Sequence, residues 1–197
     1  MNNYELNKKL NAWNPEVKEI FAEDIMNYAN TGKEGLYFIN HNNHRLYVYH
    51  GNTEIDTEYC ELNRMTIYDL HYGGGPLIGS DIDLSFGFIL PSEFNDTQIS
   101  NLILTKIASI LKKYGLKATV SGNDILVNEK KVAGSFIQQI GSRNIWCIQI
   151  SFRDYMRHIV KLCTKPMKKI PSFIPSDTLT KEQLKEDIIK IFTKERA

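Results

Sequence analysis

The residues best suited to chemistry lie between Asn123 and Gly134, where Asn123-Asp124 precedes an apolar stretch and a lysine pair follows a turn. Lys131 stands just past that turn, in the run Lys-Val-Ala-Gly. An ammonium group held in a dry pocket stabilises negative charge that develops on a carbonyl or phosphate oxygen, and one such donor is typically worth about 2.7 to 4 kcal/mol. By itself Lys131 would be a solvated hairpin lysine, which is our interpretation of Lys130. The Asn-Asp pair and the glycine on either side favour a functional role.

Three consecutive glycines, Gly73, Gly74 and Gly75, are the second feature of interest. Glycine has no Cβ, so a glycine loop lets the backbone come close to a phosphate group or an acyl chain. Three glycines alone describe a flexible turn at least as well. Their meaning therefore depends on a partner such as Lys131 being near them in the fold.

Composition excludes several classes of protein. At 197 residues the chain fits one domain, which buries about 70% of its unfolded surface. Lys and Arg (24) nearly balance Asp and Glu (23), so no basic stripe for nucleic acid is predicted. The longest nearly apolar run, Leu84 to Pro91, is too short to cross a bilayer. Three cysteines and no basic-then-apolar start predict a cytoplasmic protein without a disulfide framework.

The N-terminal half predicts a helix and several strands. A helix is expected from Asn14-Pro15 to Gly32, because apolar residues recur there at helical spacing. Leu36 to Ile39 and Arg45 to Tyr49 predict a hairpin across a turn-prone segment. Alternation from Ile82 to Phe88 predicts a strand with one buried face.

The C-terminal half gives a clearer pattern. Asp96 to Gly115 predicts an amphipathic helix with a capping aspartate and a terminal glycine. Three strands are expected next: 118–120 running into 125–127, then 132–137 after a turn at Asn128-Glu129, then 145–152. Helices are expected around Asp154 to Leu162 and after the capping-box pattern at Thr180. Strands mixed with flanking helices predict an α+β fold, with a mostly antiparallel, mixed sheet flanked by helices.

The remaining polar and aromatic residues predict no metal site. His41, His44 and His50, with Cys60 nearby in sequence, fit neither a zinc finger nor a helical His pair. Asp81 and Asp83 share a strand face and are expected to be an exposed acidic pair. Tyr47 and Tyr49 also share a face and either line a ligand pocket or, as we prefer, fill the core.

The glycine run and the Lys131-Val132-Ala133-Gly134 motif together resemble the catalytic domain shared by lipoate-protein ligases, octanoyl transferases and biotin-protein ligases. The similarity is greatest to the lipoate-ligase branch. It implies a single catalytic domain over residues 1–197, without the accessory C-terminal domain that many lipoate ligases carry. A separate polypeptide would supply that domain, or none is needed.

The resemblance also implies a reaction and a set of roles. ATP, with Mg²⁺, activates the carboxylate of lipoate as an acyl-adenylate, and a lysine on the lipoyl carrier domain of an acceptor protein then attacks it. Lys131 would touch both the acyl carbonyl and the bridging phosphate. Asn123 would hold the nucleotide with Asp124 close by, and the glycine run and Gly134 would let the backbone approach the ligands.

The sequence departs from the family pattern just before the glycine run. The ligases usually place two arginines there, whereas this chain has His71-Tyr72. Histidine is mostly neutral at pH 7 and tyrosine is neutral, so these two residues offer less to a phosphate than an arginine fork does. Nucleotide binding would be weaker or differently arranged. A degenerate family member that binds an acyl ligand or a carrier protein without chemistry is therefore an alternative.

A second alternative rests on Cys163. Octanoyl transferases are compact and use a cysteine nucleophile, located beyond the strand that follows the lysine, to form a thioester without ATP. Cys163 occupies about that region, although Leu-Cys-Thr-Lys does not reproduce their Pro-Cys-Gly motif. A lowered thiol pKa would be needed, which the nearby lysines would favour; these are Lys161, Lys165, Lys168 and Lys169.

Overall fold

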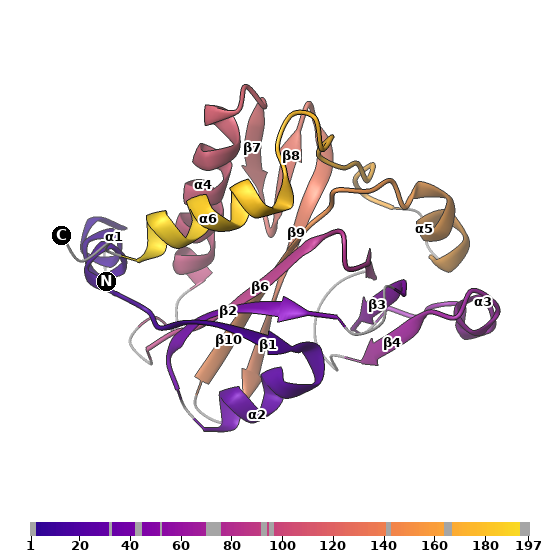
Figure 1. The fold of residues 1–197 in the computed structure, drawn as a ribbon, viewed down its shortest axis with the longest axis horizontal. Coiled ribbons are helices and arrows are strands. Elements are labelled where there is room, and N and C mark those ends of the chain that lie inside the picture. The colour runs from indigo at the N-terminus through magenta and orange to yellow at the C-terminus, as the bar shows by residue number, and fades with distance from the viewer. Residues whose placement is uncertain are drawn as a thin grey trace.

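The computed structural model describes residues 3–31, 33–41, 45–51, 53–69, 76–91, 94, 97–140, 143–163 and 167–193. Over these ranges the chain forms a seven-stranded sheet and a three-stranded sheet. Helices pack on one face of the large sheet, and the small sheet lies beside its other face (Figure 1). The predicted α+β fold, with a mixed sheet flanked by helices, is confirmed.

The large sheet has the strand order β1-β2-β6-β10-β9-β8-β7. Every neighbouring pair is antiparallel except β1 and β2, which run parallel. The strands are β1 (Val17–Phe21), β2 (Gly35–Asn40), β6 (Leu84–Ile89), β7 (Ala118–Ser121), β8 (Asp124–Val127), β9 (Lys130–Ile140) and β10 (Arg143–Ile150). Of the three strands predicted after residue 117, the last two are present as β9 and β10, and the first is divided into the antiparallel strands β7 and β8.

The small sheet is built around β3 (Tyr47–His50), which pairs parallel with β4 (Thr66–Asp69) and antiparallel with β5 (Leu77–Gly79). Two short helices, α3 (Thr57–Leu62) and α5 (Met156–Leu162), pack on its outer side. Alternate residues of β3 therefore face different surroundings. Val48 packs under these helices, whereas Tyr47 and Tyr49 face the large sheet.

Helices α4 (Thr97–Lys113) and α6 (Lys181–Phe192) cover the other face of the large sheet, together with α1 (Asn3–Ala12). One side of α4 is fully buried, as its periodicity predicts, and Gly115 ends the helix with a φ of +77°. Thr180 and Gln183 form the reciprocal hydrogen bonds of a capping box at the start of α6. Both predicted helices are confirmed, although Asp96 lies outside the described residues.

The predicted N-terminal helix is wrong. Val17–Phe21 is a strand on the edge of the large sheet, and only short helices follow it, a 3-10 turn at Ala22–Asp24 and α2 at Ile25–Asn30. A short run with two or three apolar residues is compatible with either a helix or a strand. Here the backbone pairing with β2 makes residues Val17–Phe21 a strand. Helix α1 is not predicted from the sequence.

The predicted hairpin and the one-sided strand are also wrong in part. β2 and β3 are both strands, but they belong to different sheets. β6 is buried on both faces, because α4 and α6 cover one face and the small sheet covers the other. A strand between two layers has no face exposed to solvent. The alternation of polar and apolar residues in β6 therefore does not indicate an exposed face.

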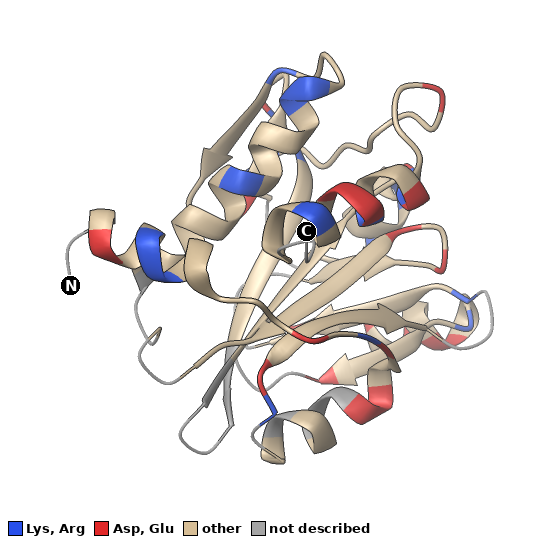
Figure 2. Ribbon diagram, turned by 60° about the vertical axis from the view of Figure 1, so that its left-hand side comes forward, with Lys and Arg blue, Asp and Glu red and all other residues tan. Residues whose placement is uncertain are grey.

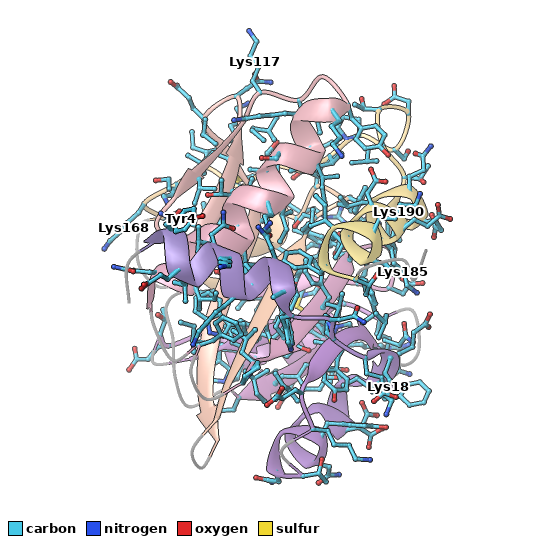
Figure 3. The ribbon with its side chains drawn as sticks, turned by 90° about the vertical axis from the view of Figure 1, so that its left-hand side faces the viewer. Tyr4, Lys18, Lys117, Lys168, Lys185 and Lys190 are labelled. Atoms are coloured by element: carbon cyan, nitrogen blue, oxygen red, sulfur yellow. The ribbon has the colours of Figure 1, made fainter. Side chains whose placement is uncertain are left out.

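Charged residues are dispersed over the molecule. Basic and acidic residues are interspersed along the ribbon (Figure 2). Lys117, Lys168 and Lys190 lie on different sides of the molecule (Figure 3). Within the described ranges, every helix falls short of the length and apolarity needed to cross a bilayer.

Candidate functional site

A tight hairpin between β8 and β9 positions the site lysine. Val127 pairs with Lys130, so the connection is the two-residue turn predicted at Asn128-Glu129. Both turn residues have positive φ, 49° and 65°. This geometry matches the twist of antiparallel strands, and it places Lys131 one residue past the turn.

A β-bulge then sets the direction of the Lys131 side chain. Asp124 pairs with Gly134 and Ile125 with Ala133, but Leu126 pairs with Lys131, which leaves Val132 as an extra residue in β9. Val132 and Ala133 are both buried in the core. In an unbulged strand, residues three apart face opposite sides. The bulge therefore brings Lys131 to the same face as Asp124 and Gly134.

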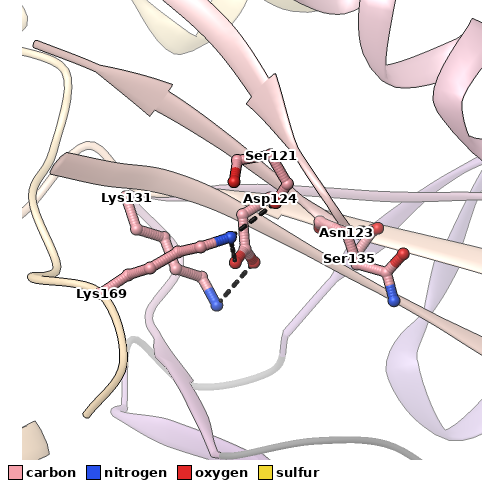
Figure 4. A network of polar contacts seen from close by, with 6 residues as sticks. All are labelled: Ser121, Asn123, Asp124, Lys131, Ser135 and Lys169. Carbon is pink, nitrogen blue, oxygen red and sulfur yellow. Dashed lines mark hydrogen bonds and ion pairs between the residues drawn. The ribbon is translucent and has the colours of Figure 1, made fainter. Parts of the chain in front are cut away.

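On that face, two lysines share one carboxylate (Figure 4). Lys131 Nζ lies 2.9 Å from Asp124 Oδ1, and Lys169 Nζ lies 2.7 Å from Asp124 Oδ2. Lys169 Nζ also donates a hydrogen bond to the backbone oxygen of Ser121 at 2.5 Å. The cluster carries two positive charges and one negative charge, so it attracts a further anion.

Gly134 provides the space in which Lys131 lies. A Cβ built on Gly134 would come within 3.0 Å of both Cε and Nζ of Lys131, and within 2.8 Å of Leu77 Cδ2. A side chain at this position would therefore displace the ammonium group or the β5 side chain. The short Lys-x-x-Gly spacing is thus a steric requirement of the bulged strand.

The main chain of Lys131 is held from two sides. On one side it pairs with Leu126 in β8. On the other, Lys131 N donates to Ile170 O at 2.8 Å and Ser172 N donates to Lys131 O at 2.7 Å. β10 ends opposite Ala133, so segment 170–172 takes the next position beside β9. This pairing fixes the backbone from which the ammonium group projects.

The cluster opens into a cavity of about 530 Å³. Asp124, Lys131, Lys169 and Gly134 form its polar side. Its apolar side comes from β5, the β9 bulge, α5 and the segment after α5, with Pro76, Leu77, Ile78, Val132, Ala133, Tyr155, Ile159 and Met167. A cavity with one cationic side and one apolar side suits an acid that carries an apolar chain.

A buried aspartate, Asp83, holds the cavity-lining residue Tyr155. Asp83 Oδ2 accepts hydrogen bonds from Ser80 N (2.9 Å) and Tyr155 Oη (2.6 Å), and Oδ1 accepts one from Phe152 N (2.7 Å). Burial raises the pKa of Asp83, and these hydrogen bonds oppose the rise. The predicted exposure of Asp83 is wrong, since the residue is buried. A local pattern could not predict this, because the hydrogen-bond partner Tyr155, which lines the cavity, is remote in sequence.

Cys163 also lines this cavity. Its thiol is half-buried and free, and burial raises the pKa. The pKa of this thiol is therefore shifted in the direction opposite to the one that a cysteine nucleophile would require. Lys169 is directed to Asp124 instead, and Lys165 lies outside the described residues.

The other predicted site residues either lie outside the described residues or do not contact the two lysines. His71, Tyr72, Gly73, Gly74 and Gly75 lie outside the described residues, although Pro76, the next residue, lines the cavity. The Asn123 carbonyl accepts hydrogen bonds from the backbone N and Oγ of Ser135 (2.8 and 2.9 Å). Asn123 lies on the opposite side of Asp124 from the two lysines (Figure 4).

Aromatic side chains fill the space between the two sheets. Tyr47 and Tyr49 are buried, which confirms their preferred assignment to the core. The His41 ring stacks on Tyr47 with centroids 3.6 Å apart, and burial lowers the pKa of His41 to about 3. Over the described ranges, no group of three or more His, Cys, Asp or Glu side chains could hold a metal ion.

The sequence was compared with known protein families and with curated proteins. A family model described as the lipoyl protein ligase A/B catalytic domain matches residues 15–192. No curated protein matches the sequence significantly.

The fold is similar to several solved structures. One is a bi-partite lipoate protein ligase from Thermoplasma acidophilum, studied with its E2 lipoyl domain, at 16% identity and a TM-score of 0.73, covering 91% of this chain and 82% of that one. Another is a lipoate-protein ligase A bound with ATP, at 18% identity and a TM-score of 0.72, covering 91% of this chain and 84% of that one. A third is a P. falciparum protein in complex with lipoate, at 20% identity and a TM-score of 0.69, covering 91% of this chain and 62% of that one. At these identities the similarity concerns the fold.

Proposed function

Because the chain belongs to the lipoyl protein ligase A/B catalytic domain family, we propose that it activates lipoate, or a related acyl acid, as an acyl-adenylate and transfers the acyl group to a lysine of a carrier domain. The observation that carries this proposal is the position of Lys131. Its ammonium group lies over Gly134, beside Asp124, on the wall of a cavity with an apolar side.

The cavity suits both parts of such an acid. The apolar residues of β5, the β9 bulge and α5 would bury the hydrocarbon chain. The carboxylate would then lie toward Lys131, whose charge is neutralised only in part because Asp124 is shared with Lys169. The fold similarity to a lipoate-bound protein and to an ATP-bound ligase supports this choice of ligands.

The proposed reaction has two steps. A carboxylate oxygen of the acid bonds to the α-phosphorus of ATP, and pyrophosphate leaves. The amine of the carrier lysine then attacks the acyl carbon, the bond to the AMP oxygen breaks, and the amine loses a proton. Negative charge grows on phosphate oxygens in the first step and on the carbonyl oxygen in the second, and Lys131 would stabilise both.

The described residues do not fit a dedicated Mg²⁺ site. They contain no group of three or more candidate ligands, and both oxygens of Asp124 are engaged by lysines. Mg²⁺ commonly enters such sites on the phosphates of the nucleotide. We therefore assign no step to a metal held by this chain.

The proposed partners follow from the reaction. The acceptor would be a lipoyl carrier domain, comparable to the E2 lipoyl domain studied with the T. acidophilum ligase. The three described cysteines are free, which suits a reducing compartment such as the cytoplasm.

The test is to incubate the purified protein with ATP and lipoate, octanoate or biotin, and to identify the bound species by mass spectrometry. We expect an acyl-adenylate, and the acid that gives it identifies the preferred chain. Binding of acid or carrier without any adenylate would contradict the proposal and would indicate a non-catalytic family member.

A second candidate function is supported by one observation, which is that Cys163 and Lys131 line the same cavity. Cys163 Sγ would attack the thioester carbonyl of an octanoyl carrier, and the carrier thiol would leave. The raised pKa of the thiol disfavours this route, because less thiolate is present at neutral pH. A mass increase on Cys163 after incubation with octanoyl carrier, absent in Cys163→Ser, would favour it over the ligase reaction.

A further inference from the structure

We propose that Lys169 is a second nucleotide ligand, which binds phosphate oxygens of ATP and rests on Asp124 when the nucleotide is absent. This inference depends on the proposed function. Its starting point is the charge of the cluster, in which Lys131 and Lys169 share the single carboxylate of Asp124. The side chains of Lys131 and Lys169 are each only 29% exposed and that of Asp124 is 17% exposed, so solvent screens the excess positive charge incompletely.

The arrangement favours a ligand with more than one anionic group. The two ammonium groups contact different oxygens of Asp124, Lys131 at Oδ1 and Lys169 at Oδ2. A fatty acid carries one carboxylate, which would satisfy Lys131 over Gly134 and leave Lys169 with only Asp124 and Ser121 O. A chain of phosphates offers separate oxygens to both lysines, and lysine binds phosphate well as a point charge.

The backbone couples the two lysines. Lys169 immediately precedes segment 170–172, whose hydrogen bonds with Lys131 N and Lys131 O hold it against β9. The segment therefore keeps the Lys169 side chain on the same cavity wall as Lys131. Lys169 thus has a fixed origin and a long side chain that can move from Asp124 to a phosphate without rearrangement of the strand.

The test measures binding of ATP alone and of octanoate alone by calorimetry. The variants are Lys169→Gln, Lys169→Arg and the control Lys117→Gln, which removes the same charge from a side chain that projects away from the molecule (Figure 3). Lys169→Gln should raise the Kd for ATP at least about tenfold, as expected for loss of a charge-assisted hydrogen bond. The Kd for octanoate should change less than about threefold, and Lys169→Arg should recover most of the ATP affinity.

Three results would overturn the inference. If wild-type protein forms the adenylate and Lys169→Gln binds ATP as tightly as wild type, Lys169 is no phosphate ligand, and the proposed function stands. If Lys169→Gln weakens ATP and octanoate equally and lowers Tm, Lys169 only tethers the segment to the hairpin. If wild-type protein binds octanoate but not ATP, the ligase function fails first and the inference fails with it.

Discussion

The ammonium group of Lys131 lies directly over Gly134, so close that a Cβ on the glycine would come within 3.0 Å of Nζ. This contact exists because the bulge at Val132 brings both residues to one face of β9. The position of the proposed catalytic group is therefore set by a residue without a side chain.

Gly134→Ala should lower the rate of adenylate formation at least about tenfold with little change in Tm. The added Cβ would meet the flexible ends of Lys131 and Leu77, so the ammonium group would move while the strand persists. Gly115→Ala is the matched control, because at φ +77° it strains the backbone beyond α4 without touching the cavity. It should cost about 1 to 2 kcal/mol of stability and leave the rate unchanged. The reverse pattern would contradict this account.

Lys131→Ala should lower acyl transfer by about a hundredfold or more, the usual effect of removing one donor from a developing negative charge. The fold should persist, because the side chain faces the cavity and not the core. Single-turnover formation of the adenylate gives the rate, and thermal unfolding checks the fold. Lys130→Ala, one residue earlier and exposed, should behave as wild type. A wild-type rate in Lys131→Ala would remove this residue from the mechanism.

His41 should make the protein sensitive to acid. Burial lowers the pKa of His41 from 6.5 to about 3. Between these two pH values, His41 is protonated in the unfolded chain and neutral in the folded chain. Stability should therefore fall as pH drops below about 6.5, by up to about 1.4 kcal/mol per pH unit from this residue. His41→Phe keeps a ring against Tyr47 and should flatten the curve between pH 6.5 and 4. Parallel curves for the two proteins in urea unfolding would refute the assignment.

Asp83→Asn should destabilise the protein by about 1 to 3 kcal/mol at pH 7, because an amide cannot accept all three hydrogen bonds from Ser80, Phe152 and Tyr155. Burial raises the pKa of Asp83, so the folded state takes up a proton first and this residue contributes more stability as pH falls toward 4. The difference between wild type and variant should widen with acid. Asp154→Asn is the control, because Asp154 is exposed and accepts a hydrogen bond from Met156 N, which the Oδ1 atom of asparagine also accepts. It should change stability little.

Much of the site could be predicted from local sequence. The turn at Asn128-Glu129 and the Lys-x-x-Gly motif lie within one hairpin, so residue types close in the chain specify them. In the sequence Lys169 is only one of the lysines near Cys163, and nothing there connects it to Asp124. The bulge at Val132 is not predictable either, because an extra residue in an apolar run does not change the local pattern.

The sequence by itself determined the elements whose cause is local, such as α4 with its apolar periodicity and the β8–β9 hairpin with its turn. The tertiary structure alone decided that Val17–Phe21 is a strand, that Asp83 is buried, and that Lys131 and Lys169 meet at one carboxylate. The reason is physical. Strand pairing, burial and ion pairing depend on free energies gained between residues distant in the chain, and a local pattern carries no record of its distant partner.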